Sequence, residues 1–181
     1  KKNKNNGKEF SVGVSINNLS LNENDIGEFK TFLKISPPLR TEEDRLALVQ
    51  GIKENLIDVI VSDHLPEDEE SKRLPFAQAA TGAIGIETLL PLSLEMYHNE
   101  SLSLEKIIET LTINPSKILK INKGSLKKGC DGDICIFDLE APWKSDAEKL
   151  KSKSKNTAIE GRTLQGKVLK TFLNGELVYN Q

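Results

Sequence analysis

A helical segment between two short apolar runs is the feature that most restricts how this chain can fold. Thr41 is followed by three acidic residues, as in the capping box that opens a helix. Apolar residues then recur at the spacing of one helix face, at positions 46, 49, 52 and 56. Strand-like runs lie on either side, at residues 10–16 and 56–62. A strand, a helix and a strand in this order predict an α/β fold with a parallel sheet that is covered on both faces.

Other segments before Gly124 also have the patterns of secondary-structure elements. Residues 29–35 also resemble a strand, which the two prolines after Ser36 would end because proline removes a backbone donor. The charged residues 67–73 predict a solvated loop. Three more helices are expected, over residues 87–97, from Ser103 and from Asn114.

The sequence pattern changes from helical to strand-like after Gly124. A β-branched run follows at residues 134–139, and two further runs flank Asn174 and Gly175, the strongest short signal for a β-hairpin. Residues 149–155 are rich in lysine and serine and resemble a linker. We therefore expect two parts, residues 1–122 and residues 123–181, with residues 1–10 as a polar loop.

Composition excludes several classes of function. The chain has 181 residues with 25 basic and 27 acidic side chains, so its charge gives no case for nucleic-acid binding. No apolar run is long enough to cross a membrane, and the N-terminal residues lack the apolar core of a secretory signal. Cys130 and Cys135 are expected to be reduced. These features favour a cytoplasmic location.

The stretch VIVSDHLPE ends an apolar run at an acid and an imidazole, Asp63 and His64. One interpretation is a turn, because Asp accepts local backbone hydrogen bonds and Pro66 follows. The other is a catalytic site at the carboxyl end of a barrel strand. The stretch alone leaves both open.

Five segments together resemble the C-terminal half of a dihydroorotase-type amidohydrolase. In sequence order they read SPPLRTEEDR, SDHLP, GAIGIETLLPL, NPSKIL and GCDGDICIFD. The family has NPPLR, DHAPH and G-x-x-G-x-E-T at the first three, and a G-x-D-A-D pattern that enters a small β-sandwich at the last. The resemblance covers residues 10–179, nearly the whole chain.

This resemblance implies a partial (β/α)8 barrel, made of its last strands and helices, with a small C-terminal β-sandwich segment. It implies zinc at the carboxyl ends of the strands and a bridging hydroxide that attacks the amide carbon of a cyclic ureide. Asp63 would be a metal ligand and the base that takes the hydroxide's proton and returns it to the leaving nitrogen. Substrate contacts are implied at four positions: Ser36, Arg40, Glu67 and Gly82.

Several positions depart from the family's pattern. The chain has no His-x-His pair, and its only histidines are His64 and His98. Asn17 stands where the family has a zinc-ligating His, and an amide oxygen is a poor zinc ligand beside imidazole. Ser36 replaces a substrate-binding Asn. Glu67 replaces a His, and its carboxylate would repel that of dihydroorotate.

Two hypotheses of different class follow. A barrel needs roughly 200 residues or more, so we expect the N-terminal half of this one to lie outside the chain. The first hypothesis is a dihydroorotase of pyrimidine synthesis that works with this missing N-terminal half. The second is an inactive homologue that serves as a structural subunit, for example as a homodimer or with aspartate transcarbamoylase. An intact His-x-His pair in the missing half would favour the enzyme.

Overall fold

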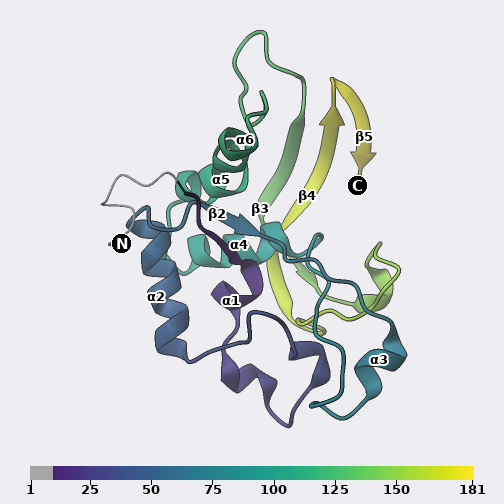
Figure 1. Cartoon of the computed structure of the whole chain (residues 1–181). Helices are drawn as coiled ribbons and strands as arrows, with labels where there is room; N and C mark the ends of the chain where they lie inside the picture. Colours follow the sequence, from purple (N-terminus) through teal and green to yellow (C-terminus); the bar gives the residue numbers. More distant parts are fainter. Residues whose placement is uncertain (1–9) are drawn as a thin grey trace.

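The protein, a computed structural model, is described over residues 10–181, so the polar loop expected at the start of the chain lies outside the described residues apart from Phe10. Figure 1 shows how the elements are arranged in space. In chain order they are β1 (Gly13–Ser15), α1 (Ile16–Ser20), η2 (Glu23–Ile26), η3 (Thr31–Leu33), α2 (Glu42–Lys53), β2 (Val59–Val61), α3 (Glu69–Arg73), α4 (Leu89–His98), α5 (Leu104–Leu111), α6 (Ile113–Leu119), β3 (Ile134–Lys144), η4 (Ala147–Lys149), β4 (Thr163–Leu173) and β5 (Glu176–Asn180).

The predicted strand–helix–strand unit is confirmed. Strands β1 and β2 pair in parallel, with Ser15 opposite Val61, and α2 forms part of the connection between them. Helix α2 begins where expected, because the Thr41 side chain accepts a hydrogen bond from the Asp44 backbone N–H at 3.2 Å. Both strands have only three residues, fewer than predicted. Strand β1 ends early because Ser15 already caps α1, its hydroxyl accepting from the backbone N–H of Asn17.

The prediction of a strand at residues 29–35 is wrong. This segment contains the 3-10 helix η3, and side chains hold it in place. The Thr31 hydroxyl donates to the carbonyl of Lys72, and the Lys34 amine donates to the carbonyls of Ala77 and Ala79 at 3.0 and 2.8 Å. A strand needs a neighbouring strand to receive its backbone hydrogen bonds, and β1 and β2 pair with each other instead.

The prediction of a solvated loop at residues 67–73 is also wrong in part. Asp68 accepts a hydrogen bond from the backbone N–H of Ser71 at 2.7 Å and so caps α3. Within α3, the Lys72 side chain turns inward and is only 1% exposed. The segment is therefore charged but fixed.

Helix α4 lies at the centre of the core and joins the two parts of the chain. Its residues Leu92, Leu94 and Met96 are buried, and it contacts α1, α5 and β4. Gly166 in β4 has a positive φ of 100°, and a Cβ there would lie 2.4 Å from a methyl carbon of Leu94. Only glycine allows the helix and the strand to approach so closely.

The C-terminal strands form an antiparallel sheet in the order β3-β4-β5. The hairpin predicted at Asn174 and Gly175 is confirmed, and both residues have positive φ values of 52° and 82°. The parallel pair and this sheet are the two sheets of residues 10–181, and they do not close into a barrel. None of the helices described in this range is long and apolar enough to cross a membrane.

Candidate active site

The carboxyl ends of β1 and β2 lie side by side, and two of the predicted site residues follow them directly. Asn17 comes two residues after Ser15, and Asp63 comes two residues after Val61, its partner in the parallel register. Asp63 is half-buried and has a φ of 49°. Asp tolerates this left-handed conformation better than most residues. The sheet thus brings the expected proton acceptor and the expected ligand position to one edge.

His64 is fixed to the glycine loop, residues 82–85. Its Nδ1 atom accepts a hydrogen bond from the backbone N–H of Gly85 at 3.1 Å. Its backbone forms a parallel bridge with Ala83, and the next N–H, that of Leu65, donates to the Ala83 carbonyl at 2.9 Å. The histidine therefore orders the turn after β2.

Both glycines of that loop are required by close approach of the backbone. A Cβ at Gly85 would lie 2.4 Å from the carbonyl oxygen of Ser62. A Cβ at Gly82 would lie 2.8 Å from the Leu65 side chain and 2.9 Å from its carbonyl oxygen. The loop consequently packs directly against residues 62–65, on either side of Asp63.

The segment that carries Ser36 and Arg40 is tied to the same edge by Asn18. The Asn18 side-chain nitrogen donates to the carbonyls of Pro37 and Pro38 at 3.3 and 3.2 Å. Ser36 itself is exposed. The Arg40 guanidinium is 71% exposed and lies 3.7 Å from the carboxylate of Asp44.

Within residues 10–181, the Asp63 carboxylate has no hydrogen bond or ion pair with any of the other predicted site residues. Glu67 is half-buried, and its backbone N–H donates to the side chain of Asn156 at 3.3 Å. Hydrogen bonds therefore connect the segments that carry these residues, but their side chains make no hydrogen bond or ion pair with the Asp63 carboxylate.

Residues 10–181 do not by themselves fit a metal centre. No group of three His, Cys, Asp or Glu side chains within residues 10–181 lies close enough to hold one ion. Asn17 is 2% exposed and its side-chain nitrogen has no hydrogen-bond partner. That nitrogen is a donor and cannot bind a cation, and the amide oxygen of the same side chain is a poor zinc ligand beside imidazole. Asp63 is thus a single candidate ligand, without a set of neighbours.

The lysine–serine segment expected as a linker lies against the glycine loop. The two carboxylate oxygens of Glu87 accept hydrogen bonds from the backbone N–H groups of Lys151 and Ser152, at 3.0 and 3.1 Å. Asn156 follows this segment directly, and its side chain binds the backbone of Leu65, Glu67 and Gly82. Side-chain hydrogen bonds therefore anchor this segment near both of its ends.

Three residues that organise this edge were missed by the sequence reasoning: Asn18, Lys72 and Asn156. Lys72 lies in a charged run and Asn156 at the end of a lysine–serine run, contexts that indicate solvent exposure. Neither spacing nor residue type signals their burial. Asn18 lies beside Asn17, and a second polar residue directly after a predicted strand is the only local signal that pointed to it.

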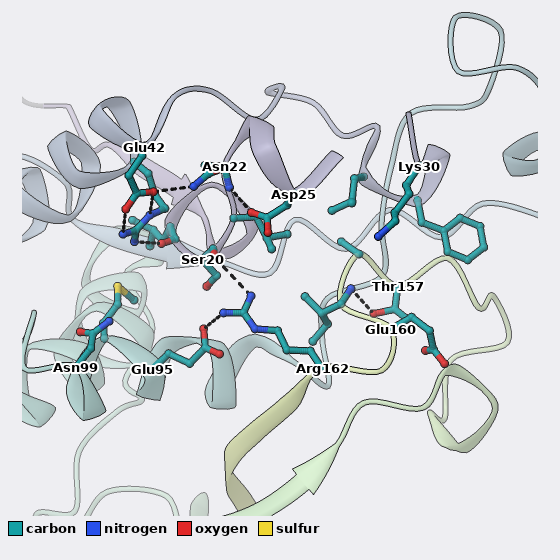
Figure 2. A pocket seen from close by; sticks show the side chains of 18 of the residues that line it. Ser20, Asn22, Asp25, Lys30, Glu42, Glu95, Asn99, Thr157, Glu160 and Arg162 are labelled. Carbon is teal, nitrogen blue, oxygen red and sulfur yellow. Dashed lines mark hydrogen bonds and ion pairs between the residues drawn. The ribbon is translucent and has the colours of Figure 1, made fainter. Parts of the chain in front are cut away.

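A cavity of about 930 Å³ lies away from this edge, between the ends of α1, α2 and α4 and residues 157–162. None of the predicted site residues lines it. Figure 2 shows the Arg162 guanidinium between Glu95, at 3.0 Å, and the carbonyl of Ser20. Burial raises the pKa of Glu95, and Arg162 partly offsets the effect. Two ion pairs, Glu95–Arg162 and Glu42–Arg45, therefore lie on the wall of this cavity.

The ion pair between Glu42 and Arg45 on the same cavity leads to a pH-dependent prediction. Hydrogen bonds from Arg45 and Asn22 lower the pKa of Glu42 to about 2. The folded-state pKa is below the ordinary 4.5, so the carboxylate stabilises the fold above pH 4.5 and loses this contribution as the pH falls towards 2. Glu42 is 46% exposed, so Glu42→Gln should cost less than about 1 kcal/mol at pH 7.

Urea unfolding of wild type and Glu42→Gln at pH 7, 4 and 3 tests this. Glu43→Gln is the control, since Glu43 lies in the same first turn of α2 and shares its favourable helix-dipole effect. The cost of Glu42→Gln should exceed that of the control at pH 7 and shrink at pH 3. A cost that is independent of pH would contradict the prediction.

Comparison with known proteins identifies the family of this chain. The model of the amidohydrolase family matches residues 13–178. A dihydroorotase of Ehrlichia canis (strain Jake) is 44% identical over 97% of this chain and 39% of its own length. A dihydroorotase of Aquifex aeolicus (strain VF5) is 40% identical over 96% of this chain and 41% of its own length. The chain thus spans about two fifths of the curated relatives that it matches.

Solved structures share the fold. An L-hydantoinase (dihydropyrimidinase) from Arthrobacter aurescens superposes with a TM-score of 0.90 and 30% identity, over 99% of this chain and 41% of that one. A dihydropyrimidinase from Brevibacillus agri NCHU1002 has the same TM-score and coverage with 21% identity, which shows the fold alone. The family match covers nearly all of the described residues. This chain belongs to the amidohydrolase family.

Proposed function

We propose that this chain supplies the C-terminal part of a dihydroorotase, which interconverts dihydroorotate and carbamoyl aspartate in pyrimidine synthesis. The observation that carries the proposal is the 44% identity to a protein named dihydroorotase across 97% of the chain. The position of Asp63 after a parallel strand supports it, because catalytic groups of barrel enzymes lie at the carboxyl ends of strands.

Asp63 is the proposed proton carrier of this reaction. As the oxygen of a water molecule bonds to the amide carbon of the ring, the Asp63 carboxylate takes a proton from that water. It then gives the proton to the ring nitrogen as the carbon–nitrogen bond breaks. The amide carbon becomes a carboxyl group and the nitrogen becomes part of a ureido group. A carboxylate in this role contributes about 10²- to 10⁴-fold to the rate.

Zinc is the cofactor implied by the family resemblance, and a metal of this kind would polarise the amide and activate the water. The described residues fit at most one of its ligands, Asp63, because Asn17 offers an unpartnered donor where a ligand is expected. Zinc therefore has no assigned step in the proposed reaction. Any further ligands would come from outside residues 10–181.

A partial (β/α)8 barrel is the proposed architecture. Besides the β1–β2 pair, single parallel bridges join His64, which follows β2, to Ala83 and join Ile84 to Thr157, so the parallel arrangement extends beyond the two strands. Residues 1–122 would form the barrel portion and residues 123–181 the small β-sandwich segment. The N-terminal half of the barrel is the proposed partner of this chain.

The alternative of an inactive structural subunit gains no support from the relatives, which carry the name of an enzyme. Hydantoin and dihydropyrimidine rings are a second candidate class of substrate, because the names of the structural neighbours refer to such activities. The identity to the named dihydroorotases is higher, which favours dihydroorotate.

Ser36, Arg40, Glu67 and Gly82 are the proposed substrate contacts. Among them, Arg40 can bind the carboxylate that distinguishes dihydroorotate from neutral rings. Its exposed ion pair with Asp44 contributes less than about 1 kcal/mol, so the guanidinium can turn towards a substrate at little cost. Glu67 adds a negative charge, which the nearby Lys72 ammonium partly balances.

Arg40→Met should therefore raise the KM for dihydroorotate by about 30-fold and leave kcat within about threefold, because a hydrogen bond to a charged group contributes roughly 1.5–3 kcal/mol. Arg73→Met is a closely matched control. Arg73 is also 71% exposed and also pairs with an acid four residues away, Glu69. Equal KM values for the two variants would exclude Arg40 from substrate binding.

A further inference from the structure

Lys72 is a buried lysine whose amine binds backbone carbonyls. Its Nζ donates to the carbonyl oxygens of Lys34, Ala80 and Gly82 at 3.3, 2.9 and 2.8 Å, which uses all three of its N–H groups. Burial lowers the pKa of this amine, and the charge of Glu67 partly offsets the effect. Burying an ammonium is costly unless its hydrogen bonds are made, so this arrangement fixes two backbone segments, at Lys34 and at residues 80–82, against α3.

Asn156 is a second buried side chain that binds the backbone around Gly82, and it comes from a distant part of the sequence. It is 2% exposed, and its side-chain oxygen accepts from the N–H of Glu67 at 3.3 Å. Its side-chain nitrogen donates to the carbonyls of Leu65 and Gly82 at 3.1 and 3.2 Å. Its own carbonyl accepts from the N–H of Ile84 at 3.2 Å. One side chain thus holds the loop after Asp63 and the glycine loop together.

The two side chains share an acceptor. The carbonyl oxygen of Gly82 receives hydrogen bonds from both Lys72 and Asn156. Lys72 and Asn156 come from segments far apart in the sequence, α3 and the residues that precede β4. Together they form a clamp, which we define as these two side chains and the Gly82 carbonyl between them.

The clamp acts on the residues that set the position of Asp63. The Asp63 carboxylate itself has no hydrogen bond or ion pair within residues 10–181, and its φ is 49°. Its direction therefore depends on the backbone on either side. On one side are β2 and Ser62, and on the other are Leu65 and Glu67, which Asn156 holds.

We propose that Lys72 and Asn156 are positioning residues for the Asp63 carboxylate, acting through the Gly82 carbonyl and the backbone of residues 65–67. The inference rests on the proposed function, since it assigns the clamp to the proton transfer made by Asp63. A misplacement of about 1 Å in a reacting group can cost about 100-fold in rate. The clamp also holds two proposed substrate contacts, Glu67 and Gly82, but Arg40, which is proposed to bind the carboxylate of dihydroorotate, lies outside it. Loss of the clamp should therefore lower kcat by more than it raises KM.

The test uses the protein expressed from its intact gene, with Lys72→Met, Asn156→Leu and the double variant. Each single variant should lower kcat for dihydroorotate about 30- to 100-fold and leave KM within about threefold. The double variant should lose much less than the product of the two single effects, because both act through one carbonyl. Lys106→Met and Asn114→Leu are the controls. Lys106 binds Asn55 and Glu109 through its amine, Asn114 binds the Asp58 carbonyl through its side-chain nitrogen, and both variants should keep the wild-type kcat.

Hydrogen exchange tests the clamp independently of the proposed activity. In Asn156→Leu the amide of Glu67 should lose protection, while the amides of α2 keep theirs. Folded variants with wild-type kcat would overturn the inference even if the wild type is active. If the wild type does not open dihydroorotate, the proposed function fails, and unchanged protection at Glu67 would overturn the clamp as well. If Lys72→Met does not fold, Lys72→Gln, which keeps one donor group, takes its place with the same expected loss of kcat.

Discussion

Asp63→Asn should lower kcat for dihydroorotate hydrolysis by about 1,000-fold, the largest effect expected of any substitution in this chain. The amide cannot accept the proton of the attacking water, and removal of a general base costs about 10²- to 10⁴-fold. The fold should be unaffected, because Asn adopts the left-handed conformation of residue 63 as readily as Asp does. The measurement is steady-state ring opening by the intact protein, with circular dichroism as a check of folding.

Asp131→Asn is the matched control for this change. Asp131 is an exposed carboxylate before β3, and its contact is the Lys123 amine at 2.7 Å. The same loss of charge there should leave kcat unchanged. If Asp63→Asn keeps more than a tenth of the wild-type kcat, Asp63 is not the proton carrier and its position after β2 is that of a turn residue.

Gly85→Ala should destabilise the protein by about 3 kcal/mol, near the upper end of the cost of overpacking a buried site. The new methyl carbon would lie 2.4 Å from the Ser62 carbonyl oxygen. The contact is with backbone, so no side-chain rotation can relieve it, and either the glycine loop or the end of β2 must move. Urea unfolding gives the change in free energy, and kcat should fall as well because Ser62 precedes Asp63.

Gly129→Ala separates the steric clash expected at Gly85 from the backbone strain of an alanine at positive φ. Gly129 has a positive φ of 91° and no atom within 4 Å of an added Cβ. Its replacement should cost only about 1 kcal/mol, the usual penalty for placing alanine in such a conformation. Equal costs at the two positions would mean that the close approach at Gly85 does not constrain the site.

Local signals in the sequence were sufficient for the elements that depend on local chemistry. Helix α2 begins at its predicted cap, Thr41, and α5 begins after Ser103. The hairpin forms at Asn174 and Gly175, since a tight turn requires residues that accept positive φ. In each case one or two side chains satisfy the backbone groups of the same segment.

The failures occurred where a segment's partner is distant in the sequence. Residues 29–35 have the composition of a strand, but no strand within residues 10–181 pairs with them. Thr31 binds a carbonyl of α3 instead, and Lys34 binds the carbonyls of Ala77 and Ala79. The charged run around Lys72 was expected in solvent, yet its amine finds three carbonyls from two other segments. Such contacts are a property of the tertiary fold and leave no local signature.

The candidate site shows the same difference between local and long-range contacts. The position of Asp63 could be predicted, because a polar residue after a buried parallel strand lies at the carboxyl edge of the sheet, and the structure places Asn17 at that edge too. The residues that hold the site together could not be predicted. Asn18, Lys72 and Asn156 act through backbone carbonyls 8 to 91 positions away along the chain, so residue type alone carries no information about them.

The most direct test of the account is the rate of ring opening by the protein expressed from its intact gene, with dihydroorotate, hydantoin and dihydrouracil compared at equal concentration. The account predicts that dihydroorotate is opened with the highest kcat/KM and that this activity is lost in Asp63→Asn. Opening of the two neutral rings but not of dihydroorotate, or no opening of any of the three, would contradict it.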